Sequence, residues 1–298
     1  MNFLNKDISL SQRKYFAAFF VFLILGFMFL LAFFSSRGIF GIPGDSGTVD
    51  EIAHIPSGYS YDRYLDFRLN PEHPPLAKAL AGFPLAIQNS INGIKSDRSW
   101  EGINQWEAGW YLLYEAGNDP ANVLFWARLP MIFLMIGLGL FIYKWAAELW
   151  SRRIGLLVLL LYAFYPDVIA HGRLVTTDIA AAFGYVISIY YFDKALVKND
   201  HKSVIYAGIA FGIAQLLKFS AFLLFGVLLF LVIIRSILNR KESSFIGEFW
   251  KNIKKYFWTC TISLIVVWIV YIPFVWNTPA GIEHEVIEGN LTQDPGTL

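Results

Sequence analysis

Residues 15–34 read YFAAFFVFLILGFMFLLAFF, a run of 20 residues without a charged side chain. As an α-helix this run is about 30 Å long, which matches the hydrocarbon core of a bilayer. Three basic residues precede it, as in a secretory signal peptide. However, the run exceeds the roughly 7–15 apolar residues of such a peptide, and Ser35-Ser36-Arg37 is a poor cleavage context. The sequence therefore predicts an uncleaved first transmembrane helix.

Further apolar runs predict that the chain crosses the membrane about seven times. The fold class we expect is all-α, a polytopic integral membrane protein, organised as one module over residues 1–298 that forms the N-terminal part of a longer chain. The six further predicted spans are 121–143, 154–170, 175–193, 203–217, 219–235 and 256–276.

The basic residues of the predicted loops are sorted by side. The segments 1–14, 144–153, 194–202 and 235–255 carry 15 of the 24 Lys and Arg residues, whereas most acidic residues fall in the other loops. Because basic residues concentrate on the cytoplasmic side, we expect a cytoplasmic N-terminus and an extracytoplasmic tail. That tail is residues 277–298. The compact chain favours a bacterial cytoplasmic membrane over the endoplasmic reticulum.

Composition excludes several other classes of protein. Hydrophobic residues make up 56% of the chain and charged residues 16%, against about 25% charged in a soluble domain. The formal net charge of +1 provides no basic field for a nucleic-acid partner. The single cysteine, Cys260, cannot form an intrachain disulfide or a cysteine-based metal site.

One connection, residues 35–120, is much longer than a bundle requires, and long loops tend to carry function. Within it, residues 74–88 form an apolar helical face, and Trp106, Trp110 and Tyr114 form an aromatic stripe at helical spacing. Both segments suit short helices lying at the membrane surface. Plain anchoring of the loop to the bilayer is the alternative interpretation.

Two adjacent acids, Asp50 and Glu51, lie shortly after the first span, and His54 follows one helical turn after Asp50. Two neighbouring carboxylates raise each other's proton affinity, which is one way to obtain a general base that works near neutral pH. A solvated acidic turn is the alternative. Asp50, Glu51, His54 and His73 could also ligate a divalent metal, but their spacing is not diagnostic of any metal, and we expect none.

The segment 70–78, NPEHPPLAK, places rigid prolines before a predicted helix. Such rigidity can hold His73 and Lys78 in place. A lysine on the first turns of an interfacial helix suits an anionic lipid head group, although ordinary snorkelling explains it equally well.

Four further ionisable residues lie at the outer ends of predicted spans: Arg128, Arg173, Asp178 and Lys218. Asp178 also suits a helix dipole, so a structural role is the alternative for it. Charged groups at such depth are costly and mark candidate functional sites. Together with Asp50, Glu51, Lys78 and His73, they are all predicted on one side of the membrane.

These residues occur in a characteristic order: Asp50-Glu51 after the first span, then His73-Pro74-Pro75-Leu76-Ala77-Lys78, then Ala127-Arg128-Leu129, then Arg173 with Asp178 five positions later. The pattern resembles the dolichyl-phosphate-mannose protein mannosyltransferase family, which belongs to the GT-C class of phospholipid-carrier-dependent glycosyltransferases. The resemblance covers about residues 15–235. Members of that family usually continue with several more spans.

The resemblance implies transfer of a sugar, for which mannose is the family's best-known case, from a polyprenyl-phosphate donor to an acceptor hydroxyl on the extracytoplasmic face with inversion. Asp50 would be the general base, Glu51 would orient acceptor or sugar, and Asp178 would help to shape the site. Lys78, Arg128 and Arg173, with Lys218 as a further member, are the cations available to bind the donor phosphate, and His54 and His73 are expected to shape the site. A protein, lipid or glycan acceptor is compatible with this chemistry. A non-catalytic membrane protein that binds or transports lipid-linked sugar is the alternative function.

Overall fold

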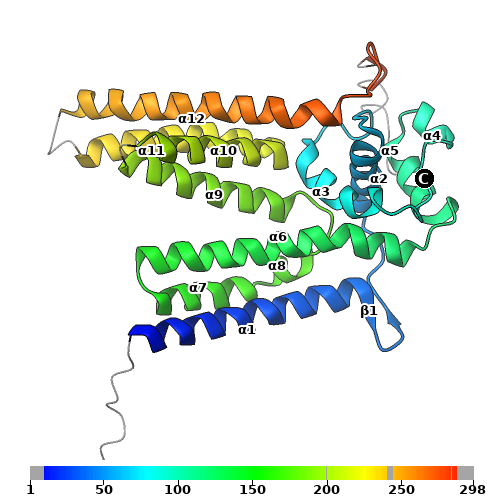
Figure 1. Ribbon diagram of the computed structural model, residues 1–298, viewed down its shortest axis with the longest axis horizontal. Helices are drawn as coiled ribbons and strands as arrows, with labels where there is room; N and C mark the ends of the chain where they lie inside the picture. Colours follow the sequence, from blue (N-terminus) through cyan, green and yellow to red (C-terminus); the bar gives the residue numbers. More distant parts are fainter. Residues whose placement is uncertain (1–9, 199, 240–243, 283, 287–298) are drawn as a thin grey trace, which may run out of the picture.

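The computed structural model describes residues 10–198, 200–239, 244–282 and 284–286, which are mostly helical (Figure 1). Within these residues, five helices are long and apolar enough to cross a bilayer, so the chain is a polytopic integral membrane protein. They are Tyr15–Arg37 within α1 (Leu10–Arg37), α6 (Pro120–Leu149), α9 (Asp178–Val197), Phe219–Leu238, which joins η2 (Phe219–Phe222) to α11 (Leu223–Leu238), and α12 (Phe245–Phe274).

The predicted count of seven spans is not confirmed, because two of the predicted spans are shorter in the structure. The span at 154–170 is broken into α7 (Arg152–Ala163) and α8 (Pro166–His171). The break precedes Pro166, whose ring disfavours a helical conformation for the residue before it. The span at 203–217 is α10 (His201–Leu217), with 17 residues against the roughly 20 of an average span.

The long helices lie side by side and alternate in direction (Figure 1). The C-terminal ends of α6, α9 and α11 and the N-terminal ends of α7, α10 and α12 lie at one end of this bundle. The described residues of the predicted basic segments 144–153, 194–202 and 235–255 are therefore gathered at that end, and the long segment between α1 and α6 lies at the other.

Two apolar clusters hold the bundle together. One joins α1, α6 and α7 through residues such as Met28, Met135 and Leu159, and the other joins α9, α10 and α11 through Phe192, Phe211 and Leu228.

Between α10 and α12 the contact depends on glycine. A Cβ added at Gly208 would lie 2.5 Å from Ile262, and one added at Gly212 would lie 2.8 Å from Val266. Such small residues four positions apart let membrane helices approach closely. The glycines of α10 therefore set its packing against α12.

The segment between α1 and α6 folds into a layer of short elements around its own apolar core. The helix expected at 74–88 is present as α3, and the aromatic stripe at 106–114 is divided between a short helix and a π-helical turn. The elements are β1 (Gly38–Ile39), β2 (Ile42–Pro43), α2 (Val49–Tyr64), α3 (Pro75–Ala86), α4 (Arg98–Glu101), α5 (Gln105–Trp110) and η1 (Tyr111–Glu115). The two strands pair antiparallel as a hairpin at the end of α1.

Helices α2 and α3 cross at a point where both carry glycine. A Cβ at Gly82 would lie 2.1 Å from the carbonyl carbon of Gly58, so a side chain there would force the helices apart. Helix α3 also packs against α6 and α10. The close crossing thus fixes α2, which begins with the two predicted acids, against the transmembrane bundle.

The chain beyond α12 returns to this layer. The backbone N–H of Asn277 donates to the carbonyl of Leu65 at 2.8 Å, and the Thr278 hydroxyl accepts from the N–H of Phe67 at 2.9 Å. The start of the predicted tail 277–298 therefore lies against the α2–α3 connection. Residue 283 and residues 287–298 of that tail, and residues 1–9 of the predicted cytoplasmic N-terminus, lie outside the described residues.

Candidate active site

The two adjacent acids in the first turn of α2 lie in different environments. Glu51 is fully buried, whereas the Asp50 side chain is exposed and makes no hydrogen bond or ion pair with any described residue. Consecutive residues of a helix point about 100° apart, so when one faces the protein the other can face solvent. The pair therefore divides into one structural carboxylate and one free carboxylate.

Glu51 is saturated with hydrogen bonds. Arg128 of α6 donates from Nε to Oε1 at 2.7 Å and from Nη2 to Oε2 at 2.6 Å, with both side chains fully buried. The N–H of Thr48 donates to Oε2 at 2.9 Å and completes a cap on the helix. Burial alone would raise the pKa of Glu51, but the ion pair with Arg128 and the backbone donors lower this pKa below its usual value. Glu51 is thus a buried anion that is paired with Arg128 of α6.

Arg128 also holds the loop that leads into α2. Its Nη1 and Nη2 donate to the carbonyls of Asp45 and Ser46 at 2.9 and 2.8 Å. The carboxylate of Asp45 in turn pairs with Arg173, whose Nε donates to it at 3.0 Å. One buried arginine thereby links α6, the loop before α2 and the segment before α9.

Val175 is fixed from two sides by α2. Its N–H donates to Glu51 at 3.1 Å, and its carbonyl accepts from Nδ1 of His54 at 2.9 Å. Burial, together with the nearby positive charge of Lys78, lowers the pKa of His54 to about 4, so this imidazole is neutral near pH 7. His54 therefore acts in the structure as a neutral donor that positions residues 173–178.

Lys78 of α3 is fully buried and its ammonium group has three neutral acceptors. It donates to the carbonyl and side-chain oxygens of Asn70 at 2.5 and 2.7 Å and to the carbonyl of His73 at 2.8 Å. Burial lowers the pKa of Lys78 well below its usual value, while Glu72 opposes that shift. Lys78 thus stabilises the turn that carries His73, whose ring centroid lies 5.4 Å from that of His54.

A polar network beside Lys78 was not predicted from the sequence. The Asn70 amide donates to Gln105 of α5 at 2.5 Å and to Glu72 at 3.0 Å, and Gln105 donates to Glu72 at 2.9 Å. Asn70 and Glu72 lie in the NPEHPPLAK segment, but in the sequence they are noticeable only as neighbours of His73. Gln105 lies 33 residues beyond Glu72, and no local pattern marked it.

Asp178 and Lys218 form an accessible ion pair. The Lys218 Nζ donates to Asp178 at 2.5 Å across the start of α9 and the end of α10, and 31% of the lysine side chain and 59% of the aspartate side chain are exposed. Asp178 lies three residues after the fixed Val175. The predicted cation and the predicted acid are therefore available to a ligand at the same place.

The predicted site residues therefore divide into two groups. Glu51, Arg128, Lys78 and His54 are buried and hold the backbone, whereas Asp50 and Asp178 are exposed and Lys218, Arg173 and His73 are partly exposed. Asp45 was not among the predicted site residues, yet it pairs with Arg173. Among the described residues, no group of three or more His, Cys, Asp and Glu side chains is placed to hold a metal ion.

An apolar groove of about 570 Å³ opens beside these elements. Leu76, Leu80 and Phe83 of α3 line it, together with Leu129, the residue after Arg128, and Asp62 of α2. All three of these α3 side chains belong to the apolar face predicted for the 74–88 helix.

The comparisons with known proteins bear on the part of the chain after α5. A sequence model described as dolichyl-phosphate-mannose-protein mannosyltransferase matches residues 121–272, about half of the chain. The matched range includes Arg128, Arg173, Asp178 and Lys218, and it begins after Asp50 and Lys78. No curated protein matches the sequence at a significant level.

Proposed function

We propose, from the premise that this chain belongs to the dolichyl-phosphate-mannose-protein mannosyltransferase family, that it moves a sugar from a polyprenyl-phosphate donor to an acceptor hydroxyl. At the level of the family, it is a membrane-embedded glycosyltransferase of the polyprenyl-phosphate-sugar type. The particular reaction, and the residues that perform it, are the proposal.

One observation carries this proposal: the free carboxylate of Asp50 stands directly beside a carboxylate that is buried on Arg128. The Glu51–Arg128 pair fixes the backbone of Asp50, and the bond from Val175 to Glu51 fixes the segment that leads to Asp178. A general base needs an accessible, positioned carboxylate, and this arrangement supplies one.

In the proposed step, the acceptor hydroxyl oxygen attacks the anomeric carbon of the donor sugar. Asp50 takes the hydroxyl proton as the new carbon–oxygen bond forms, and the bond from the anomeric carbon to the phosphate oxygen breaks. The departing polyprenyl phosphate keeps that electron pair. A single displacement of this kind inverts the configuration at the anomeric carbon.

The phosphate becomes more negatively charged as it leaves, so positively charged side chains should lie close to it. Arg173 and Lys218 are the candidates, since both carry exposed surface beside Asp178. Preorganised charges of this type typically contribute a few kcal/mol to transition-state stabilisation. The burial of Lys78 and Arg128 supports a positioning role for them: each holds backbone carbonyls rather than an open coordination position.

The groove between α3 and α6 suits the first isoprenoid units of the donor. Its walls are apolar side chains apart from Asp62, and it adjoins the residue after Arg128. An apolar tail seated there would leave its phosphate near the polar residues at the outer end of the bundle. The short helix α3 would then contribute to both lipid binding and the site.

The topology that suits this site retains seven crossings and a cytoplasmic N-terminus. Helices α7 and α8 together extend over Arg152–His171, and α10 lies alongside α9 and α12. Counting both as spans, the basic connections all fall on one side. The Asp50 side of the bundle would then be extracytoplasmic.

The test uses membranes that contain the full-length protein, supplied with radiolabelled polyprenyl-phosphate sugars. We expect transfer by the wild type and loss of about 10²–10⁴-fold in rate for Asp50→Asn, the range for a positioned acid or base. Glu101→Gln is the matched control, since it removes an exposed carboxylate that makes no hydrogen bond or ion pair with a described residue.

Retained transfer in Asp50→Asn would exclude Asp50 as the base. Absence of transfer from every donor by the wild type, with polyprenyl phosphate still bound, would instead support the alternative of a lipid-linked-sugar binding or transport protein. Donor binding is therefore measured in the same membranes.

A further inference from the structure

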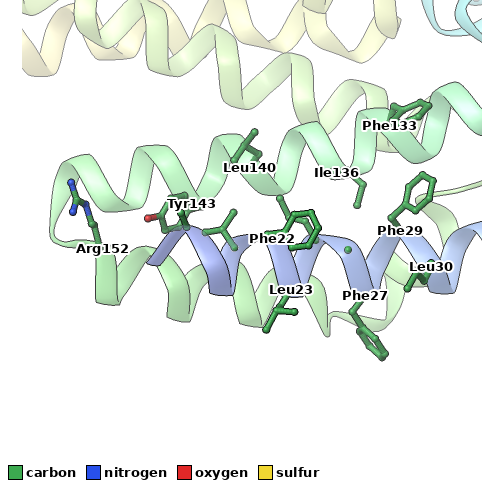
Figure 2. A pocket seen from close by; sticks show the side chains of 14 residues that line it. Phe22, Leu23, Phe27, Phe29, Leu30, Phe133, Ile136, Leu140, Tyr143 and Arg152 are labelled. Carbon is green, nitrogen blue, oxygen red and sulfur yellow. The ribbon is translucent and has the colours of Figure 1, made fainter. Parts of the chain in front are cut away.

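A second apolar groove lies between α1 and α6, and it meets the groove between α3 and α6 at Phe133, which lines both. This second groove has a volume of about 1020 Å³, which is at the upper end of the range for ligand sites. Figure 2 shows side chains of α1 and α6 along its walls, with Phe29 and Phe133 toward one end and Tyr143 and Arg152 at the other. The groove is apolar except at that second end.

Among the described residues that line the groove, the charged one is Arg152, the first residue of α7. Its side chain is exposed and makes no hydrogen bond or ion pair with any described residue. It begins α7 at the end of the bundle that carries the basic connections, whereas Asp178 begins α9 at the opposite end (Figure 1). A head group at Arg152 is therefore remote from the candidate active site.

The depth of the groove matches one leaflet of a membrane. Its wall on α1 runs from Ala18 to Leu30, about 18 Å at 1.5 Å per residue. One leaflet of the hydrocarbon core is about 15 Å thick. An acyl chain that enters from the Arg152 end thus has room along the whole groove, with its phosphate at the level of the arginine.

We propose that this groove is a binding site for one anionic phospholipid of the leaflet at the basic end of the bundle, with an acyl chain between α1 and α6 and the phosphate on Arg152. The free cation at the mouth selects negative charge, and the apolar walls select a lipid chain. This site would stabilise the contact of the first transmembrane helix with the rest of the protein.

Substitution of a glycine that lines the groove offers a direct way to fill the groove. Gly26 lines it, and a Cβ added there would meet no atom within 4 Å, so Gly26→Leu directs a side chain from an open position into the groove. Gly226 of α11 is equally open but lies outside the groove, which makes Gly226→Leu the matched control. Arg153→Gln is the corresponding control for Arg152→Gln, because Arg153 is exposed beside it and does not line the groove.

The experiment titrates the delipidated, full-length protein in detergent with dioleoyl-phosphatidylglycerol or dioleoyl-phosphatidylcholine and counts bound lipids by native mass spectrometry. We expect one phosphatidylglycerol to bind preferentially, and about fivefold weaker binding to Arg152→Gln, the effect of one surface charge on an anionic lipid. Arg152→Lys and Arg153→Gln should retain binding. Gly26→Leu should lose it, whereas Gly226→Leu should not.

Three results would overturn the proposal. Equal binding of the two lipids would mean an ordinary annular contact, and equal binding by Arg152→Gln and Arg153→Gln would remove the arginine from the site. Stronger competition by undecaprenyl phosphate than by phosphatidylglycerol would assign the groove to the carrier. Melting temperatures of the five groove and control variants, compared with the wild type, separate loss of binding from loss of the fold.

Discussion

Arg128 donates hydrogen bonds to both carboxylate oxygens of Glu51 in a fully buried ion pair, with donor–acceptor distances of 2.7 and 2.6 Å. Through this pair the second long helix of the bundle is tied to the first turn of α2. The geometry of the candidate base, one residue earlier, therefore depends on a contact between residues 77 positions apart.

Removing Arg128 should destabilise the protein strongly. Arg128→Met leaves Glu51 as an uncompensated buried charge, which typically costs about 3–5 kcal/mol. The measurement is the temperature at which the protein aggregates in detergent, read by size-exclusion chromatography. The double variant Arg128→Met/Glu51→Leu should recover part of this loss, because it leaves no charge unpaired. A single variant as stable as the wild type would contradict the pair's structural role.

Lys218 should matter far more for activity than for stability. Its ion pair with Asp178 is solvent-accessible, and such pairs are worth about 0–1 kcal/mol. If Lys218 meets the donor phosphate, Lys218→Gln should lower the transfer rate by about 10²-fold. Lys254→Gln, an exposed lysine of α12, is the control. Unchanged transfer with Lys218→Gln would remove this lysine from the phosphate site.

The sequence predicted the membrane class, the helix at 74–88 and the gathering of the polar residues at one end of the bundle, since hydropathy, prolines and charge sorting are local signals. It did not predict which of Asp50 and Glu51 is buried. Both are carboxylates at neighbouring positions, and the choice is made by Arg128, which lies far along the chain. Tertiary contacts of this kind leave no trace in a single sequence.

The predicted span at 154–170 is interrupted for a different reason. Hydropathy continues through Phe164 and Tyr165, whereas the backbone turns there before Pro166. The fourth span was placed three residues early, at 175 rather than at Asp178, because Val175 is apolar but bonds to Glu51 and His54 instead of continuing a helix. In both places a backbone constraint overrides an apolar pattern.

Ionisation of the Asp62 carboxyl group should lower the free energy of unfolding of the protein as the pH rises. It lines the groove between α3 and α6, its Oδ2 has no hydrogen-bond partner among the described residues, and burial raises its pKa to about 7. The folded state therefore keeps a proton that the unfolded chain releases near pH 4, so this contribution weakens from about pH 4 to pH 7.

Asp62→Asn removes that dependence. We expect the variant to be more stable than the wild type at pH 8, because its amide places no charge at this buried position, and to gain much less at pH 5. The difference at pH 8 is at most about 4 kcal/mol, at 1.36 kcal/mol per pKa unit. Thermal midpoints of the two proteins at both pH values test this. An equal difference at pH 5 and pH 8 would show that Asp62 does not titrate in this range.

His54 should have the opposite effect on pH dependence. Burial and the nearby charges of Lys78 and His73 lower its pKa to about 4, against the opposing influence of Glu72. Below about pH 6.5 the unfolded chain gains a proton that the folded protein excludes, so stability is lost as the pH falls from 6.5 towards 4. The shift corresponds to at most about 3 kcal/mol, at 1.36 kcal/mol per pKa unit.

His54→Gln keeps a side-chain donor that can reach the Val175 carbonyl but does not titrate. Its thermal midpoint should therefore change less than that of the wild type between pH 7 and pH 4.5, whereas His171→Gln, at an exposed histidine at the end of α8, should follow the wild type. The same slope in all three proteins would mean that His54 does not resist protonation in the fold. Because His54 holds the segment that leads to Asp178, the loss of stability in acid should be accompanied by loss of donor binding, measured on the same samples with a radiolabelled polyprenyl phosphate.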